Sequence, residues 1–331
     1  MKKKRNYILF TVLILLLITS VFADLLFGSI HIAFADFFQT IFGKNSNSIL
    51  HEIIINYRLP KALTAILAGA SLSVAGLLLQ TLFRNPLADP YILGVSSGAS
   101  LGVALVVMAG AFLPITIIQS GWTQILAAVV GAALVLSAVI AVSYKVRNVV
   151  SLLIVGIMFG TICSSLITVL QNASNPDMLK IFIAWTFGSL VVSWSYLLVL
   201  LPVMLIGIVA AFMIQKPLDG LLLGEQYAQT MGISVKTMRI VIVVITGVLA
   251  GGITAFTGPI AFVGVAVPHL ARGLFRTSEH RILMSASAVC GAILLLSCDI
   301  ITQIPTNPLP INTVSALLGA PVIIWILLKK S

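Results

Sequence analysis

Residues 80–100, QTLFRNPLADPYILGVSSGAS, separate two long apolar stretches with charge, proline and small side chains. The first half holds the residues that a continuous apolar helix would not contain: Arg84, Asn85, Pro86, Asp89 and Pro90. Each proline lacks an N–H and clashes with the preceding turn, so no single helix passes through. The second half is small and hydroxyl-rich, with Gly94, Ser96, Ser97 and Gly98, and allows close packing of a following helix. The stretch therefore predicts a tight, charged hinge between two helices.

The composition identifies the solvent around these helices. Of the 331 residues, 60% are hydrophobic and 8% are charged, and the mean hydropathy is +1.15, whereas soluble domains carry about 25% charged residues. A helix needs roughly 20 apolar residues to cross a bilayer. We therefore expect an all-α polytopic membrane protein, one transmembrane domain over residues 1–331. Its spans, about ten, are expected near residues 7–27, 58–83, 92–110, 122–143, 149–171, 195–215, 239–256, 260–270, 282–300 and 312–328.

The net charge of +10 could indicate nucleic-acid binding, but the basic residues follow the ends of the expected spans. With the N-terminus inside, fifteen of the nineteen basic residues, Arg147 among them, fall on the cytoplasmic side. Only Lys44, Arg58, Lys61 and Lys180 fall outside. This asymmetry satisfies the positive-inside rule. Both termini are therefore predicted to be cytoplasmic, and the expected contacts are with membrane lipid and not with nucleic acid.

Small residues recur within the spans at the spacing of helix contacts. The pairs are Gly98 with Gly102, Gly156 with Gly160, Gly247 with Gly251, and Gly69 with Ser73. Such pairs let helix backbones approach closely in lipid, although a glycine-rich chain also produces them by chance. Together they favour a compact bundle.

The spans lack the residues that would supply energy or catalysis. Asp24 and Asp299 lie near span ends, and the sequence places no charged residue at a helix midpoint, where an ion-coupled secondary transporter usually needs one. No GxxxxGK[ST] phosphate loop is present. The histidines, His31, His51, His269 and His280, show no metal-ligand spacing, and no clustered side chains indicate an intramembrane enzyme. A partner is expected to supply the energy, and an ion-coupled secondary transporter is the main alternative.

The longest polar segment on the expected cytoplasmic side is residues 216–239. Residues 221–231 can form one short helix with Glu225 and Gln226 exposed, and Gly232 can end it in a left-handed cap. A short amphipathic helix between two spans is typical of a docking element, but also of an ordinary interfacial helix.

Five segments in order resemble the FecCD family, the permease subunits of ABC importers for ferric siderophores, haem and cobalamin. They are RLPK (58–61), LAGASLSVAGLLLQTLFRNPLADPYILGVSSGAS (67–100), LLLGEQYAQTMGI (221–233), GPIAFVGVAVPHLARGLF (258–275) and SALLGAP (315–321). The resemblance implies a ten-helix subunit in the bacterial cytoplasmic membrane that pairs with a second permease copy, with a homodimer expected. It also implies two cytoplasmic ATPase subunits, which hold ATP and Mg, and an extracytoplasmic substrate-binding protein. No cofactor on this chain is implied.

The resemblance also assigns roles to residues. The ATPase-coupling residues would be Leu223, Gly224, Glu225, Gln226, Ala228 and Gly232. The pathway or hinge residues would be Arg84, Asn85, Pro86, Asp89, Pro90, Gly94, Ser96, Ser97 and Gly98. Arg58 and Lys61 would bind carboxylates of the substrate-binding protein, with Lys61 replacing the usual arginine of the family motif. In the segment before the last helix, Gln303 stands where the family commonly has a basic residue, and Pro308 and Asn312 stand where it usually has an acidic residue and a glycine. Docking through the loop 299–312 is therefore expected to differ.

Weak internal symmetry accompanies these motifs. Residues 63–90 end in a Gly/Pro-bearing break, and residues 242–268 reach a similar break at Gly258 and Pro259 while running in the opposite direction. Paired interruptions of this kind are typical of inverted repeats. The sequence therefore suggests repeats over about 58–171 and 239–328.

Overall fold

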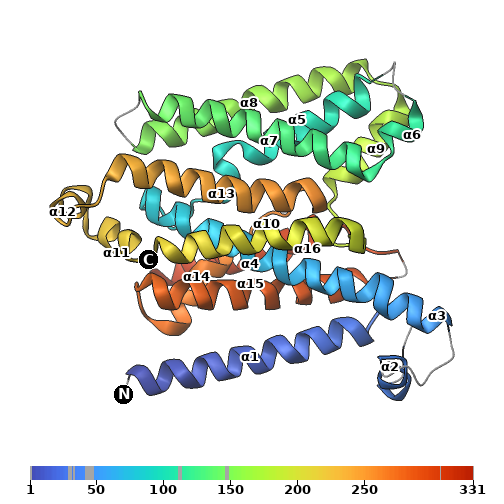
Figure 1. Ribbon diagram of the computed structural model, residues 1–331, viewed down its shortest axis with the longest axis horizontal. Coiled ribbons are helices and arrows are strands. Elements are labelled where there is room, and N and C mark those ends of the chain that lie inside the picture. The colour runs from blue at the N-terminus through green and yellow to red at the C-terminus, as the bar shows by residue number, and fades with distance from the viewer. Residues whose placement is uncertain are drawn as a thin grey trace.

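The computed structural model describes residues 2–28, 32, 34–41, 48–110, 114–145, 149–305 and 307–330, and all elements in these ranges are helices. Lys44, Arg147 and His31, which enter the sequence predictions, lie outside the described residues. Figure 1 shows the long helices running side by side along one axis. In chain order the elements are α1 (Lys2–Leu26), α2 (Phe34–Ile41), α3 (Ser48–His51), the π-helix η1 (Glu52–Arg58), α4 (Leu59–Phe83), the 3₁₀-helix η2 (Pro90–Leu93), α5 (Val95–Met108), α6 (Ile115–Ile118), α7 (Gly121–Ser143), α8 (Val149–Ala173), α9 (Pro176–Thr186), α10 (Trp194–Met213), α11 (Gln215–Leu223), α12 (Glu225–Thr230), α13 (Val235–Thr257), α14 (Val263–Phe275), α15 (His280–Thr302) and α16 (Ile311–Lys330).

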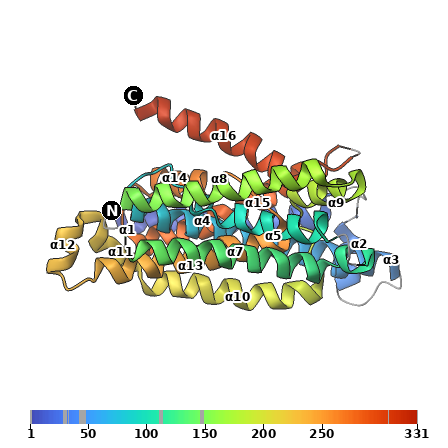
Figure 2. The ribbon, with the colours of Figure 1, turned by 90° about the horizontal axis from the view of Figure 1, so that it is seen from above.

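The all-α fold predicted from composition is confirmed. Among the described residues, seven helical stretches are long and apolar enough to cross a membrane, and three shorter apolar helices, within α5, α14 and α16, accompany them. Each expected stretch overlaps one of these helices. Figures 1 and 2 place both chain ends and α12 at one end of the molecule, with α2, α3 and α9 at the other. The exact number of spans and the side on which the ends lie stay predictions.

The centre of the bundle is α4, which packs against α10, α13, α14 and α15. Its small residues explain the close approach. A side chain at Gly69 would collide with the backbone of Gly291 in α15, and one at Gly76 would collide with Gly264 in α14. Backbones that pack this tightly leave no room for lipid, and van der Waals contact replaces the missing hydrophobic drive. The predicted pairs at Gly69, Gly98 and Gly156 do lie at helix contacts, because Gly98 in α5 meets the backbone of Gly131 in α7 and Gly156 in α8 meets the backbone of η2.

Two helices contrast with this centre. Only 17% of the apolar window of α8 is buried inside the subunit. The start of α16 packs on α14 and α15, but Figure 2 shows the rest leaving the bundle on the side where α8 lies, opposite α10. Its side chains Leu317 and Ile324 are correspondingly exposed. One flank of the subunit therefore presents two long apolar helices that the chain itself does not cover.

Candidate functional site

The hinge predicted at residues 84–98 is a turn with three defined steps. The helix α4 ends where Arg84 adopts a left-handed backbone (φ 47°). Asp89 then caps η2, because its Oδ1 accepts the backbone N–H of Tyr91 at 2.8 Å. Gly94, also left-handed (φ 74°), ends η2 and begins α5. The helix break predicted from Pro86 and Pro90 is therefore confirmed. The pathway role of these residues stays a prediction.

This turn is joined to the second break, between α13 and α14. The hydroxyl oxygen of Tyr91 accepts the backbone N–H of Ile260 at 3.1 Å and the hydroxyl of Thr254 at 3.3 Å. Pro90 packs against Gly264 so closely that a side chain there would collide with the proline ring. Two helix breaks that are about 170 residues apart in the chain thus form one junction, of the kind that lines cavities in transporters.

Hydrogen bonds of Gln80 also join α4 to α14 near this junction. The side-chain amide of Gln80 donates to the carbonyl oxygens of Gly264 and Val265, both at 3.3 Å, and its oxygen accepts from Arg272 at 2.5 Å. Gln80 and Arg272 lie within the family segments given above, but no local pattern predicts that they contact each other. Their partners lie more than 180 positions away, and only the fold reveals them.

The segment expected to couple to an ATPase differs from the predicted single helix over 221–231. It is two short helices, α11 and α12, separated at Gly224, whose backbone (φ 130°, ψ 150°) is one that only glycine adopts readily. The left-handed cap at Gly232 (φ 79°) is confirmed. Ala228 is buried, while Leu223, Gln226 and Tyr227 are exposed at the tip. The break was missed because helical periodicity does not reveal a backbone angle.

Side chains connect this segment to the core. Arg84 donates to the carbonyl oxygen of Leu221 at 3.1 Å. Asp219 Oδ1 lies 2.7 Å from Nδ1 of His280, and the other ring nitrogen of His280 lies 2.7 Å from the hydroxyl of Thr81. The imidazole thus bridges α11 to α4 from its position at the start of α15. Glu225, expected to be exposed, is only partly so and pairs with the buried Arg239 at 3.4 Å.

Arg58 and Lys61, which follow α3 at the end opposite the chain termini and were expected to offer charge to a binding protein, are buried instead. Arg58 is 5% exposed and donates to the carbonyl oxygens of Leu25 and Leu26 at 2.7 and 2.9 Å, which caps the end of α1. Lys61 is 7% exposed and lies 2.8 Å from Asp299. The helix that carries both extends well before residue 58, so they face inward from a long element and not outward from a loop. Docking through their side chains stays a prediction, but the exposed surface it assumed is absent.

Asp24 completes this outer cluster. It is 3% exposed and interacts electrostatically with Asp299, Lys61 and Arg58. Gln303, noted as a departure from the family motif, donates to Asp299 Oδ2 at 3.1 Å. The sequence correctly placed Asp24 and Asp299 near span ends. No member of the cluster lies at a helix midpoint, as expected, but the sequence did not predict that two acids and two bases would gather in the interior.

The exposed flank of α8 carries a stripe of polar side chains that sequence analysis missed. Thr161, Ser164, Ser165, Thr168 and Asn172 are all exposed. Their spacing of three or four residues puts them on one face of the helix. The hydroxyls of Thr161 and Thr168 donate to carbonyl oxygens of their own helix, at 2.9 and 3.0 Å. Five polar side chains on one face of an apolar span nevertheless favour water or a partner there over acyl chains. The spacing was present in the sequence and could have revealed the stripe.

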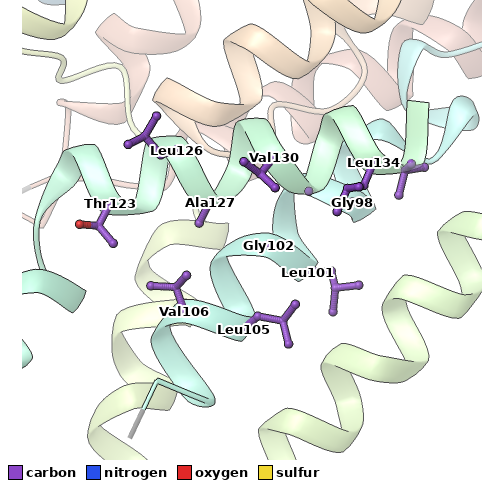
Figure 3. Close-up of a pocket in the computed structure, with 12 residues that line it drawn as sticks. Gly98, Leu101, Gly102, Leu105, Val106, Thr123, Leu126, Ala127, Val130 and Leu134 are labelled. Carbon is purple, nitrogen blue, oxygen red and sulfur yellow. The ribbon is translucent and has the colours of Figure 1, made fainter. Parts of the chain in front are cut away.

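An apolar hollow of about 510 Å³ between α5 and α7 has the opposite character. Figure 3 shows leucine and valine side chains from both helices around it, with Thr123 as the polar exception. Gly98 lies in its wall, against the backbone of Gly131. A polar cargo would lose its hydration here without compensation. This hollow therefore fits lipid, and the role of Gly98 that its contacts support is close helix packing.

The class of protein follows from three features: the two joined helix breaks, the segment α11–α12 that hydrogen bonds connect to the core, and the polar stripe on the uncovered flank. Together they define a polytopic membrane permease. Comparison with known proteins identifies which one. The model of the FecCD transport family matches residues 15–329, and the chain belongs to that family.

Named relatives cover most of the chain. It is 33% identical over 301 residues to the hemin transport system permease protein HmuU of Yersinia pestis, with 88% of each protein covered. It is 37% identical over 280 residues to the vitamin B12 import system permease protein BtuC of Salmonella typhimurium, with 83% of each covered. A solved structure assigned to the metal-chelate type of ABC transporters, in an inward-facing conformation, superposes with a TM-score of 0.86 at 28% identity and covers 98% of this chain and 99% of its own. The chain is thus a multi-pass ABC permease subunit of the bacterial cytoplasmic membrane.

Proposed function

We propose that this chain translocates a metal chelate (a ferric siderophore, haem or cobalamin) into the cytoplasm by alternating access. The observation that carries the proposal is the similarity over more than four-fifths of the chain to permeases named for hemin and for vitamin B12. Both cargoes enclose a metal in a large macrocycle, and a pathway for them needs width and polar lining more than a tight pocket.

A second copy of the chain is the partner we propose for the uncovered flank. The polar stripe of α8 and the projecting part of α16 lie on that side (Figure 2). Pairing of two such flanks would cover the apolar residues of α16 and enclose the stripe, since a closed two-fold pair repeats the same surface on both copies. The cargo would then pass between the two subunits.

Energy would come from two cytoplasmic ATPase subunits, which hold ATP and Mg, while this chain binds no cofactor and hydrolyses nothing. The exposed tip at Leu223, Gln226 and Tyr227 supports this, because it stands out from the bundle at the end that holds both termini (Figure 1). An extracytoplasmic binding protein would deliver cargo at the opposite end.

The test is reconstitution of the permease with the ATPase and binding protein of its own system in liposomes. Uptake of radiolabelled haem, a ferric siderophore or cobalamin should require ATP inside the compartment that holds the ATPase, and the binding protein outside. Absence of ATP-dependent uptake for all three cargo classes would contradict the proposal.

An ion-coupled secondary transporter is the second candidate, favoured by the buried cluster of Asp24, Arg58, Lys61 and Asp299. Buried ionisable residues in membrane helices often mark ion pathways. However, the cluster contains equal numbers of acids and bases and lies at the helix ends, which fits a structural role. Liposomes that contain the permease alone decide between the two, because uptake driven by an imposed proton or sodium gradient without ATPase would establish the alternative.

A further inference from the structure

A hollow of about 580 Å³ lies between the start of α1 and the turn that joins α14 to α15. Both elements lie at the end of the molecule that holds the chain termini (Figure 1). Its floor is apolar, because the rings of Phe10 and Phe275 pack there with their centroids 4.7 Å apart. Its rim is strongly basic. We propose that this hollow binds the headgroup of an anionic glycerophospholipid of the cytoplasmic leaflet.

The charge around the hollow is unbalanced. Four basic residues, Lys3, Arg5, Arg276 and Arg281, line it against one acid, Glu279. In the part of the chain that the structure describes, no ion pair involves any of the four. A phosphate monoester or diester is the ligand chemistry that such a group attracts, and arginine suits it best because its planar fork donates two hydrogen bonds.

Basic residues at cytoplasmic span ends are common, since they set orientation in the membrane. These four differ because separate elements bring them around one open hollow. Arg5 is fixed there by a hydrogen bond of 2.6 Å to the carbonyl oxygen of Phe275 at the end of α14. Arg276 occupies a left-handed backbone position (φ 49°), which non-glycine residues adopt rarely.

Two further observations fit a phospholipid headgroup in the hollow. Arg281 lies in the first turn of α15, where the helix dipole disfavours a cation, so a neighbouring phosphate would offset that repulsion. The buried side-chain oxygen of Asn6, which also lines the hollow, has no hydrogen-bond partner among the described residues. A lipid glycerol hydroxyl could donate to it.

The occupant is a lipid because the hollow is continuous with a lipid-facing surface. Tyr7 lines it and is 74% exposed, and Ile14, two turns further along the same face of α1, is exposed as well. Only 17% of the apolar window of α1 is buried inside the subunit. A headgroup in the hollow would therefore extend its acyl chains along α1, with Tyr7 at the interface, where amphipathic rings concentrate.

The experiment is a titration of the purified full chain in neutral detergent with phosphatidylglycerol or phosphatidylcholine, counted by native mass spectrometry. We expect one tightly bound phosphatidylglycerol per chain and at least tenfold weaker binding of phosphatidylcholine. The variant R276Q/R281Q should weaken phosphatidylglycerol binding about 30-fold, because each basic residue near an anionic lipid contributes about 1 kcal/mol. The matched variant K145Q/K216Q removes two exposed charges outside the hollow and should change binding less than twofold.

Other outcomes overturn the inference. Equal binding of the two lipids would show that the hollow does not recognise the charge of the headgroup. Equal losses of binding in both double variants would reduce the effect to the overall charge of the protein. Competition by soluble glycerol phosphate at the lipid's own concentration would make this a site for free phosphates. Loss of a co-purifying ATPase from R276Q/R281Q with lipid binding unchanged would assign the surface to a protein partner. If the double variant fails to fold, R281Q alone should still lower affinity about fivefold. The inference does not depend on the cargo, since lipid binding is measured without transport.

Discussion

At the scale of single residues, the outer cluster illustrates how a membrane chain accommodates charge. Lys61 and Asp299 lie 2.8 Å apart with side chains 9% and 3% exposed. A charge buried without its partner is costly, whereas a matched pair approaches neutrality. Arg58 contributes differently, since it satisfies carbonyl oxygens at the end of α1 that the helix leaves unpaired. The cluster thus holds α1, α4 and α15 together through charge and hydrogen bonds.

Replacement of Lys61 by Met should destabilise the protein by about 3 kcal/mol, because Asp299 then loses its buried partner. The double variant K61M/D299L should recover most of this loss. The measurement is thermal unfolding in detergent by fluorescence-detected gel filtration. Lys180→Met is the control, because its pair with Asp177 is exposed. An unchanged unfolding midpoint for K61M would show that the ion pair between Lys61 and Asp299 does not stabilise the fold.

The Asp219 to His280 contact belongs to the same scale but serves the coupling segment. Asp219→Asn keeps the shape but removes the charge that faces the imidazole at 2.7 Å. We expect ATPase assembly to persist while transport per ATP hydrolysed falls severalfold, because α11 is then less firmly joined to α15 and α4. Asp177→Asn, at the exposed surface, should leave this ratio unchanged. An unchanged ratio of transport to ATP hydrolysis in D219N would show that the contact between Asp219 and His280 plays no part in coupling.

At the scale of elements, the features that could be predicted from the sequence are those caused by residues close together in the chain. The prolines at 86 and 90 act on their own neighbourhood, so the break before α5 could be read directly. The pairing of Lys61 with Asp299 joins residues 238 positions apart, and no local pattern contains it. The stripe from Thr161 to Asn172 could have been found by spacing alone, whereas the break at Gly224 could not, because a backbone angle leaves no periodicity.

The break at Gly224 gives a prediction for the coupling segment. With φ at 130°, Gly224→Ala imposes strain of about 1–3 kcal/mol, although no neighbouring atom lies within 4 Å of the added methyl. We expect α11 and α12 to change their relative direction and ATPase stimulation to fall, with the core intact. The control is Gly273→Ala, which has equal space and no unusual φ. Equal ATPase activity in the two variants would contradict a role for this angle.

At the scale of the whole molecule, the uncovered flank and the hollow between α5 and α7 favour different surroundings. The stripe on α8 is polar and the hollow between α5 and α7 is apolar. A closed pair would bring the first face to its centre and leave the second toward lipid. The repeat relation predicted for 58–171 and 239–328 stays a prediction, although the breaks that end α4 and α13 do meet at one junction.

Accessibility to water distinguishes these faces. In a background without the three native cysteines, a cysteine at position 168 should react with a membrane-impermeant thiol reagent, because Thr168 lies on the polar stripe. A cysteine in place of the exposed Leu134, beside the apolar hollow, should react at least tenfold more slowly. Labelling is counted by mass shift in membranes that contain the assembled transporter. Equal rates would contradict the assignment of the two faces.

Through the projecting part of α16, the stability of each copy would depend on the proposed second copy. The projecting part of α16 exposes leucine and isoleucine side chains, and in the proposed pair the second copy would supply the contacts that these side chains lack within their own chain. Anything that binds only the folded form adds to its apparent stability by mass action. The lifetime of this permease in the cell should therefore rise with its density in the membrane, and a newly inserted copy that finds no mate would be the form that membrane proteases remove first.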